Sequence, residues 1–131
     1  MKILLIQIEK TTDSYLTEGV KIYTERLKNY ISFSTETISM AKNIRQKPFD
    51  EQRRAEALEI QKLLDPSDFL VCMDEHGKQF TSVQFADFLN KRMVSGCKRV
   101  VFLIGGPFGI DKSILDKSSY VLSLSNMTFS H

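Results

Sequence analysis

Cysteine and histidine are scarce in this sequence, and their scarcity excludes several kinds of site. Of the 131 residues two are cysteine, Cys72 and Cys97, and they lie in no C-x-x-C pattern or His/Cys cluster. A zinc site or a disulfide framework would need such a pattern. We therefore expect no metal, and a reducing cytoplasm is the compartment that this cysteine usage fits best.

The histidines also argue against a hydrolase. They are His76 and His131, and neither has a serine or cysteine nucleophile with an aspartate at hand, so a catalytic triad is not expected. Two glycine-rich nucleotide motifs are missing as well, because the sequence contains neither G-x-G-x-x-G nor a loop that ends in G-K-[ST]. The dinucleotide fingerprint and the P-loop are thereby excluded.

Long hydrophobic runs are absent too. No apolar stretch approaches the length of a membrane span, and the opening residues, MKILLIQIEK, form too short an apolar run for a signal peptide. We expect no membrane partner. The length of 131 residues predicts a single domain over residues 1–131, large enough to bury a core.

The net charge is small, but basic residues cluster in one stretch. The whole chain carries 18 basic and 16 acidic residues, a net charge of +2, which does not by itself require a nucleic-acid partner. Residues 42–54 include five basic residues against Asp50 and Glu51; they are Lys42, Arg45, Lys47, Arg53 and Arg54. This stretch has two interpretations: a solvated loop and helix start, or a contact for the phosphates of an RNA partner.

Strand-like and helix-like segments alternate along the chain. Strands are expected at residues 2–8, 33–40, 69–74, 99–104 and 120–124, and helices at about 15–30, 50–64, 81–94 and 111–118. The sequence EHGK after the third strand is typical of a turn, and Thr81 with Gln84 forms a capping-box pattern. This order predicts an α/β fold with a mostly parallel sheet and helices on both faces.

The ends of three expected strands carry residues suited to a ligand. They read Met73-Asp74-Glu75, Gly105-Gly106-Pro107, and LSNMTF at residues 124–129. In open parallel sheets, ligands bind beyond the carboxyl ends of the strands. Backbone groups there could hold a purine edge between apolar side chains. Because these ends contain no lysine or arginine, a neutral or zwitterionic nucleoside is favoured over a triphosphate. For the glycine loop, a structural turn without a ligand stays an equal alternative.

Three stretches, MKILLIQI, LIGGPFGI and YVLSLSNMTFSH, resemble the ribosomal RNA large subunit methyltransferase H family. These are small enzymes of the SPOUT superfamily, and the resemblance covers essentially the whole chain. It implies a SPOUT-type sheet whose C-terminal part forms a trefoil knot. Knots are nearly absent from proteins, so no argument from composition or spacing predicts one.

The resemblance also implies a function. Members of the family are cytoplasmic homodimers that use S-adenosylmethionine to methylate N3 of a pseudouridine in 23S rRNA of the assembled ribosome. The residues implied to contact the cofactor lie at the same three strand ends; they are Met73, Gly105, Gly106, Leu124, Ser125, Asn126, Met127, Thr128 and Phe129.

Two departures from the family bear on activity. Members continue beyond the position of His131 with a helix that completes the knot and the dimer contact, and they have proline where this chain has Ser130. We expect the knot-closing helix to be absent from these residues, and we assign no catalytic base. The alternative function is a non-catalytic module that binds RNA or ribosomes through a SPOUT-like fold. A flavodoxin-like nucleotide-binding protein is a third interpretation, disfavoured because no Ser/Thr-rich phosphate loop follows the first strand.

Overall fold

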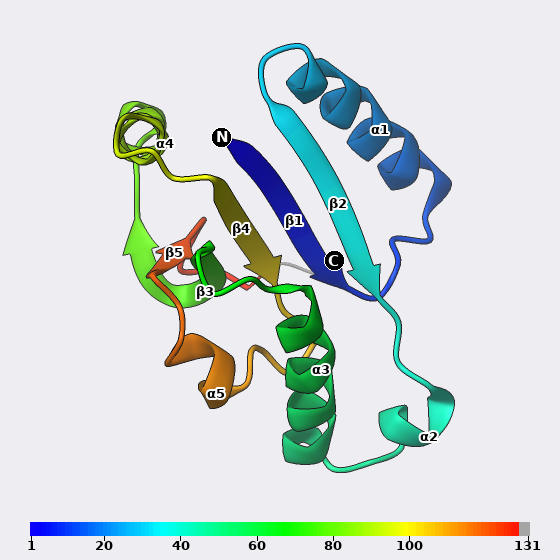
Figure 1. The fold of residues 1–131 in the computed structure, drawn as a ribbon. Coiled ribbons are helices and arrows are strands. Elements are labelled where there is room, and N and C mark those ends of the chain that lie inside the picture. Colours follow the sequence, from blue (N-terminus) through cyan, green and yellow to red (C-terminus); the bar gives the residue numbers. More distant parts are fainter. Residues whose placement is uncertain (129–131) are drawn as a thin grey trace.

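The apolar runs expected as strands form one sheet in the computed structural model, which describes residues 1–128. The strands are β1 (Lys2–Ile8), β2 (Ser32–Ile38), β3 (Phe69–Gln79), β4 (Arg99–Ile104) and β5 (Tyr120–Ser123). They lie in the order β2-β1-β4-β3-β5, and every neighbouring pair is parallel (Figure 1). The expected α/β class and parallel sheet are confirmed.

Five helices connect the strands: α1 (Ser14–Lys28), α2 (Lys42–Arg45), α3 (Phe49–Leu63), α4 (Ser82–Val94) and α5 (Lys112–Leu115). The capping box at the start of α4 is confirmed, because Thr81 Oγ1 accepts from the amide of Gln84 and Gln84 Oε1 accepts from the amide of Thr81. The basic stretch after β2 was expected as a loop, but it begins with the short helix α2.

The expected turn at EHGK is wrong, because β3 continues through it to Gln79. After a bulge beyond Met73, Lys78 and Gln79 pair with Leu122 and Ser123 of β5. The glycine in this segment serves close packing of two strands rather than a turn. A Cβ atom at Gly77 would lie 2.7 Å from the carbonyl carbon of Val121.

Alternate residues along the central strands point to opposite faces of the sheet. One face is fully covered: β1, β3 and β4 bury their apolar side chains there against Ala57 and Ile60 of α3 and Ile114 of α5. The strand residues of this core are Leu4, Ile6, Ile8, Ile38, Leu70, Cys72, Val101 and Leu103. α3 forms this contact with one face, since its buried residues Gln52, Glu56 and Ile60 are spaced four apart.

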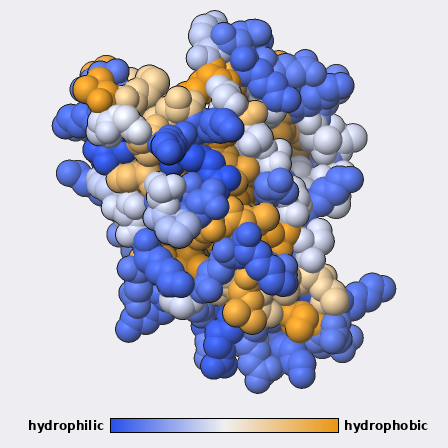
Figure 2. Space-filling model, viewed as in Figure 1, coloured by the Kyte–Doolittle hydropathy of each residue, from blue (hydrophilic) through white to orange (hydrophobic). Residues whose placement is uncertain are grey.

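The other face is covered less completely. Phe85 and Phe88 of α4 pack over Val71, Val100 and Leu122. α1 has an apolar stripe, as expected, but none of its residues is buried. Exposed apolar side chains are common on this molecule (Figure 2). No helix within residues 1–128 is long and apolar enough to cross a membrane.

Candidate functional site

The sheet order brings the three strand ends together. β3 lies between β4 and β5, and in the register of the sheet Met73 pairs with Ile104 on one side and Leu122 on the other. Met73, the last paired residue of β3 before its bulge, is therefore flanked by the end of β4, which leads into the glycine loop, and by β5, which leads into the segment after it. The residues that the sequence singled out share one edge of the sheet, except Phe129, which lies outside the described residues.

The glycine loop after β4 folds back on itself. The amide of Gly109 donates to the carbonyl of Gly106 at 3.1 Å, and Gly109 has a φ of 85°, which favours glycine. A Cβ atom at Gly105 would lie 2.7 Å from Cγ1 of Ile110 and 3.1 Å from the backbone of Gly109. Glycine at position 105 is thus required by the loop itself, whether or not a ligand also approaches it.

Gly106 allows the same loop to approach a buried carboxylate. A Cβ atom there would lie 3.0 Å from Oε2 of Glu56 and 3.4 Å from Cγ2 of Ile8. Glu56, on α3, is only 4% exposed. The glycine loop therefore packs directly on the charged part of α3.

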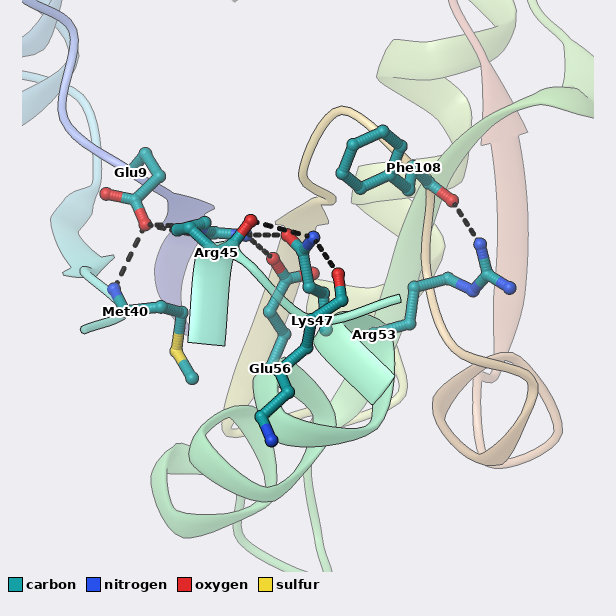
Figure 3. Close-up of polar contacts among 8 residues, drawn as sticks. Glu9, Met40, Arg45, Lys47, Arg53, Glu56 and Phe108 are labelled. Carbon is teal, nitrogen blue, oxygen red and sulfur yellow. Dashed lines mark hydrogen bonds and ion pairs between the residues drawn. The ribbon is translucent and has the colours of Figure 1, made fainter. Parts of the chain in front are cut away.

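Arg45 neutralises this carboxylate (Figure 3). Its Nη1 donates to Glu56 Oε2 at 2.6 Å and to Gln52 Oε1 at 3.2 Å, and its Nε donates to Glu9 Oε1 at 3.1 Å. Glu9, directly after β1, also accepts from the amide of Met40 at 3.0 Å. Burial alone lowers the pKa of Arg45, but the hydrogen bonds that Arg45 donates to Glu9 and Glu56, together with their negative charges, outweigh it and the pKa is raised. α2 is thereby held against the end of β1.

The basic residues of the stretch 42–54 therefore fall into two groups, those bound to other groups of the protein and those exposed. Arg45 is occupied by the carboxylates, and Arg53 pairs with Asp50 and donates from Nη1 to the carbonyl of Phe108 at 3.2 Å (Figure 3). The other three basic side chains are exposed and form no hydrogen bond or ion pair within residues 1–128; they are Lys42, Lys47 and Arg54. Arg45 and Arg53 thus fit neither interpretation, because they bind groups of the protein itself, whereas the three exposed cations are compatible with both a solvated surface and a phosphate contact.

A stacked aromatic pair joins α3 to the glycine loop. The ring centroids of Phe49 and Phe108 are 3.7 Å apart with 17° between the ring planes. Phe49 is the first residue of α3, and Phe108 lies between Gly106 and Gly109. This pair and the Arg53 bond both anchor the loop from outside the sheet.

The segment after β5 is held by its own polar groups. Ser123, 2% exposed, donates from Oγ to the carbonyl of Ser125 at 2.7 Å, and Ser125 Oγ accepts from the amide of Met127 at 3.0 Å. Leu124 and Met127 are 78% and 71% exposed. The segment therefore presents large apolar side chains to solvent, as a surface for an apolar ligand would.

The bulged part of β3, between Met73 and Lys78, supplies the carboxylates of Asp74 and Glu75. Asp74 Oδ1 accepts from the backbone amide of His76 at 2.8 Å and lies 2.9 Å from Nδ1 of its ring. His76 is exposed, as expected. Within residues 1–128, no group of histidine, cysteine, aspartate and glutamate side chains could hold a metal ion.

A groove of about 410 Å³ leads away from this edge over the incompletely covered face of the sheet. It runs between the end of α1, with Leu27, and the start of α4, with Phe85. At the strand ends it is lined by Met73, Ile104 and Leu124. The candidate site therefore has an open apolar wall on one side and the glycine loop on the other.

Comparison with known proteins identifies the family. Residues 1–131 match the family model described as predicted SPOUT methyltransferase. The chain is 44% identical over all 131 residues to a protein of Parabacteroides distasonis, and covers 83% of that relative. Relatives from Flavobacterium psychrophilum and Phocaeicola vulgatus are 43% and 40% identical, again with the whole chain matched and 83% of each relative covered.

The parallel α/β fold is consistent with that of a SPOUT methyltransferase, and the chain belongs to that family. Each of the three relatives is named ribosomal RNA large subunit methyltransferase H. The resemblance drawn from the sequence motifs is confirmed.

Sequence reasoning missed the pairing of Arg45 with Glu9 and Glu56. One signal was available, because Gln52 and Glu56 share the helical spacing of the buried Ile60 and so predict polar groups facing the core. Such groups need partners. No comparable signal links Phe49 to Phe108, which are brought together only by the tertiary fold.

Proposed function

We propose that the protein transfers a methyl group from S-adenosylmethionine to N3 of a pseudouridine in 23S rRNA, acting on the assembled ribosome. One observation carries the proposal: β4 and β5, each of which leads into a family motif, flank Met73 of β3 on its two sides. Membership of the SPOUT methyltransferase family, with relatives named for methylation of large-subunit ribosomal RNA, supports the same reaction.

The chemistry of the strand ends suits this cofactor. They offer backbone groups and the apolar side chains of Met73, Leu124 and Met127, which suit an adenosine. The carboxylates of Asp74 and Glu75 are complementary to a positively charged sulfonium, and these ends contain no lysine or arginine to repel it. We propose that the following residues hold the cofactor: Met73, Gly105, Gly106, Leu124, Ser125, Asn126, Met127, Thr128 and Phe129.

The cofactor, when bound, supplies a methyl group already activated by the positive sulfur. The protein's task is to hold donor and acceptor in line. The turn at Gly109, the stack on Phe108 and the hydrogen bonds around Ser125 fix the segments that would do this. The acceptor is an imide nitrogen, which must lose its proton before it attacks, and we assign no residue of this chain as the base.

We further propose, from family membership, a C-terminal trefoil knot and a cytoplasmic homodimer. The exposed apolar side chains of α1, among them Tyr15, Val20 and Tyr23, are surface that a partner subunit could cover.

The alternative is a non-catalytic module that binds ribosomes. The exposed cations Lys42, Lys47 and Arg54 favour it, since phosphate contacts alone can supply binding without chemistry. The two functions differ in whether the strand ends bind a cofactor.

Two measurements on the full-length protein test the proposal. The first is calorimetric titration with S-adenosylhomocysteine. The second is transfer of labelled methyl from S-adenosylmethionine to ribosomes that lack the modification, with the nucleotide located by mass spectrometry of 23S rRNA fragments. Already modified ribosomes are the control and should accept no label. Ribosome binding without cofactor binding would favour the non-catalytic alternative.

A further inference from the structure

The stack of Phe49 on Phe108 leaves an aromatic surface open. Phe49 is 57% exposed even though one face of its ring lies against Phe108 at a centroid distance of 3.7 Å. Most of the remaining ring surface therefore faces solvent. A large exposed aromatic side chain held rigidly in this way is more typical of a binding surface than of a core.

The location of this ring ties it to the candidate cofactor site. Phe108 belongs to the glycine loop at the carboxyl edge of the sheet, and the loop is fixed by the bond from Arg53 to the Phe108 carbonyl (Figure 3). A group that stacks on Phe49 is therefore positioned relative to the strand ends by two contacts, the stack of Phe49 on Phe108 and the hydrogen bond from Arg53 to the Phe108 carbonyl.

The charges near the ring favour a polyanion. Lys47 precedes Phe49 by two residues, and its exposed side chain forms no ion pair within residues 1–128. Arg54, on the second turn of α3, is likewise exposed and unpaired in the described part of the chain. The acidic residues next to the ring are Asp50, which is occupied by Arg53 and so opposes an anion less than a free carboxylate would, and the exposed Glu51; the basic residues of this stretch outnumber them. Aromatic rings next to cations are the usual platform for unpaired nucleotides.

We propose that Phe49, backed by Phe108, stacks on an unpaired base of the RNA substrate, with Lys47 and Arg54 contacting neighbouring phosphates. This inference rests on the proposed function, because it takes the RNA substrate from it. It adds a recognition surface on the outer side of the glycine loop, next to the cofactor residues but separate from them. An exposed base can use this surface, whereas a base stacked inside a duplex cannot.

The absence of tryptophan from the chain allows a direct test. Phe49→Trp introduces a single fluorophore at the proposed platform, and stacking of a base on it quenches its emission. The control is Tyr30→Trp, because Tyr30 is 87% exposed but lies just before β2, at the opposite edge of the sheet. At low salt, a short single-stranded oligouridylate should quench the Phe49→Trp protein and not the control. Equal quenching in both, or none at position 49, would overturn the proposal.

A second test uses activity and cofactor binding together. Phe49→Ala should lower kcat/KM for ribosomes by roughly 10-fold, the usual order for losing one stacked base, and Phe49→Trp should retain most of it. The affinity for S-adenosylhomocysteine should be the same in all three proteins. If Phe49→Ala weakens cofactor binding in parallel, the ring only supports the glycine loop, and the stacking proposal is wrong. Failure of the wild-type protein to methylate ribosomes would instead contradict the proposed function, whatever the fluorescence shows.

Discussion

The hydroxyl of Thr128 donates a hydrogen bond to the carboxylate of Glu75, and this bond joins the segment after β5 to the bulged part of β3. The two residues are far apart in the sequence but close at the edge of the sheet where the cofactor site is proposed. Thr128 is therefore positioned by β3 as well as by its own loop.

Removing this bond should loosen the cofactor site without unfolding the protein. Thr128→Val keeps the shape of the side chain but removes the donor, and both partners are exposed, so stability should change by less than about 1 kcal/mol. We expect several-fold weaker binding of S-adenosylhomocysteine by calorimetry and an unchanged melting temperature. Thr12→Val, at an exposed site before α1, is the matched control. Equal affinity in the two variants would show that the bond does not order the site.

Gly105→Ala should damage the glycine loop itself. The new Cβ would lie 2.7 Å from Cγ1 of Ile110, closer than the packing allows, so the loop must shift. We expect lower thermal stability together with weaker cofactor binding. Gly19→Ala in α1 is the control, because nothing lies within 4 Å of its new Cβ. That change should leave cofactor binding intact and stabilise the helix by roughly 0.5–1 kcal/mol. A Gly105→Ala protein as stable as the wild type would contradict the packing argument.

Arg45→Met should be strongly destabilising. It leaves the side chain of Glu56, which is 5% exposed, without its cation, and breaking a buried pair on one side costs roughly 3–5 kcal/mol. Urea unfolding measures the loss. Lys47→Met removes the same charge from an exposed side chain nearby and should change stability by no more than about 0.5 kcal/mol. Similar unfolding midpoints for the two variants would mean that Glu56 is stabilised without Arg45.

Asp68 should make stability depend on acid pH. Its side chain is 4% exposed and accepts from Nε of Arg99 at 2.8 Å. Burial alone raises the pKa of Asp68, but the hydrogen bonds from Arg99 and the Asp65 amide outweigh it, so the pKa lies below its ordinary value of 3.8. The stabilisation is complete above that ordinary value and is lost as the pH falls through the lowered pKa. Urea midpoints of the wild type between pH 6 and pH 2.5 should fall more steeply than those of Asp68→Asn. Parallel curves would contradict the assignment.

Most of the fold could be predicted because its signals are local. The run at Lys2–Ile8 is apolar and β-branched, and the capping pair Thr81 and Gln84 marks the start of α4 within one turn. The extension of β3 to Gln79 could not be predicted from local signals. His76, Gly77 and Lys78 have the composition of a turn, and only pairing with β5, which is distant in the sequence, makes them a strand.

The candidate site was predictable to the extent that strand ends share an edge. That argument needs only the parallel sheet. It predicts that Met73, Gly105 and Leu124 lie on the same side of the sheet without any knowledge of the strand order. The same argument could not predict which residues contact the glycine loop. Phe49 and Glu56 reach Phe108 and Gly106 from a helix between β2 and β3, and their approach depends on packing that no spacing rule describes.

The strand order has a consequence for how the chain is made. β1 lies between β2 and β4, and its first residue, Lys2, pairs with Arg99. No described strand pairs with its neighbour through a hairpin. Formation of the centre of the sheet therefore requires contacts between distant parts of the chain, and such contacts form slowly. During synthesis, β1 emerges from the ribosome first, yet one of its two edges stays without a partner until β4 has also emerged. The nascent protein therefore carries an open strand edge while the segment from β2 to β4 is made, and such an edge can pair with other chains.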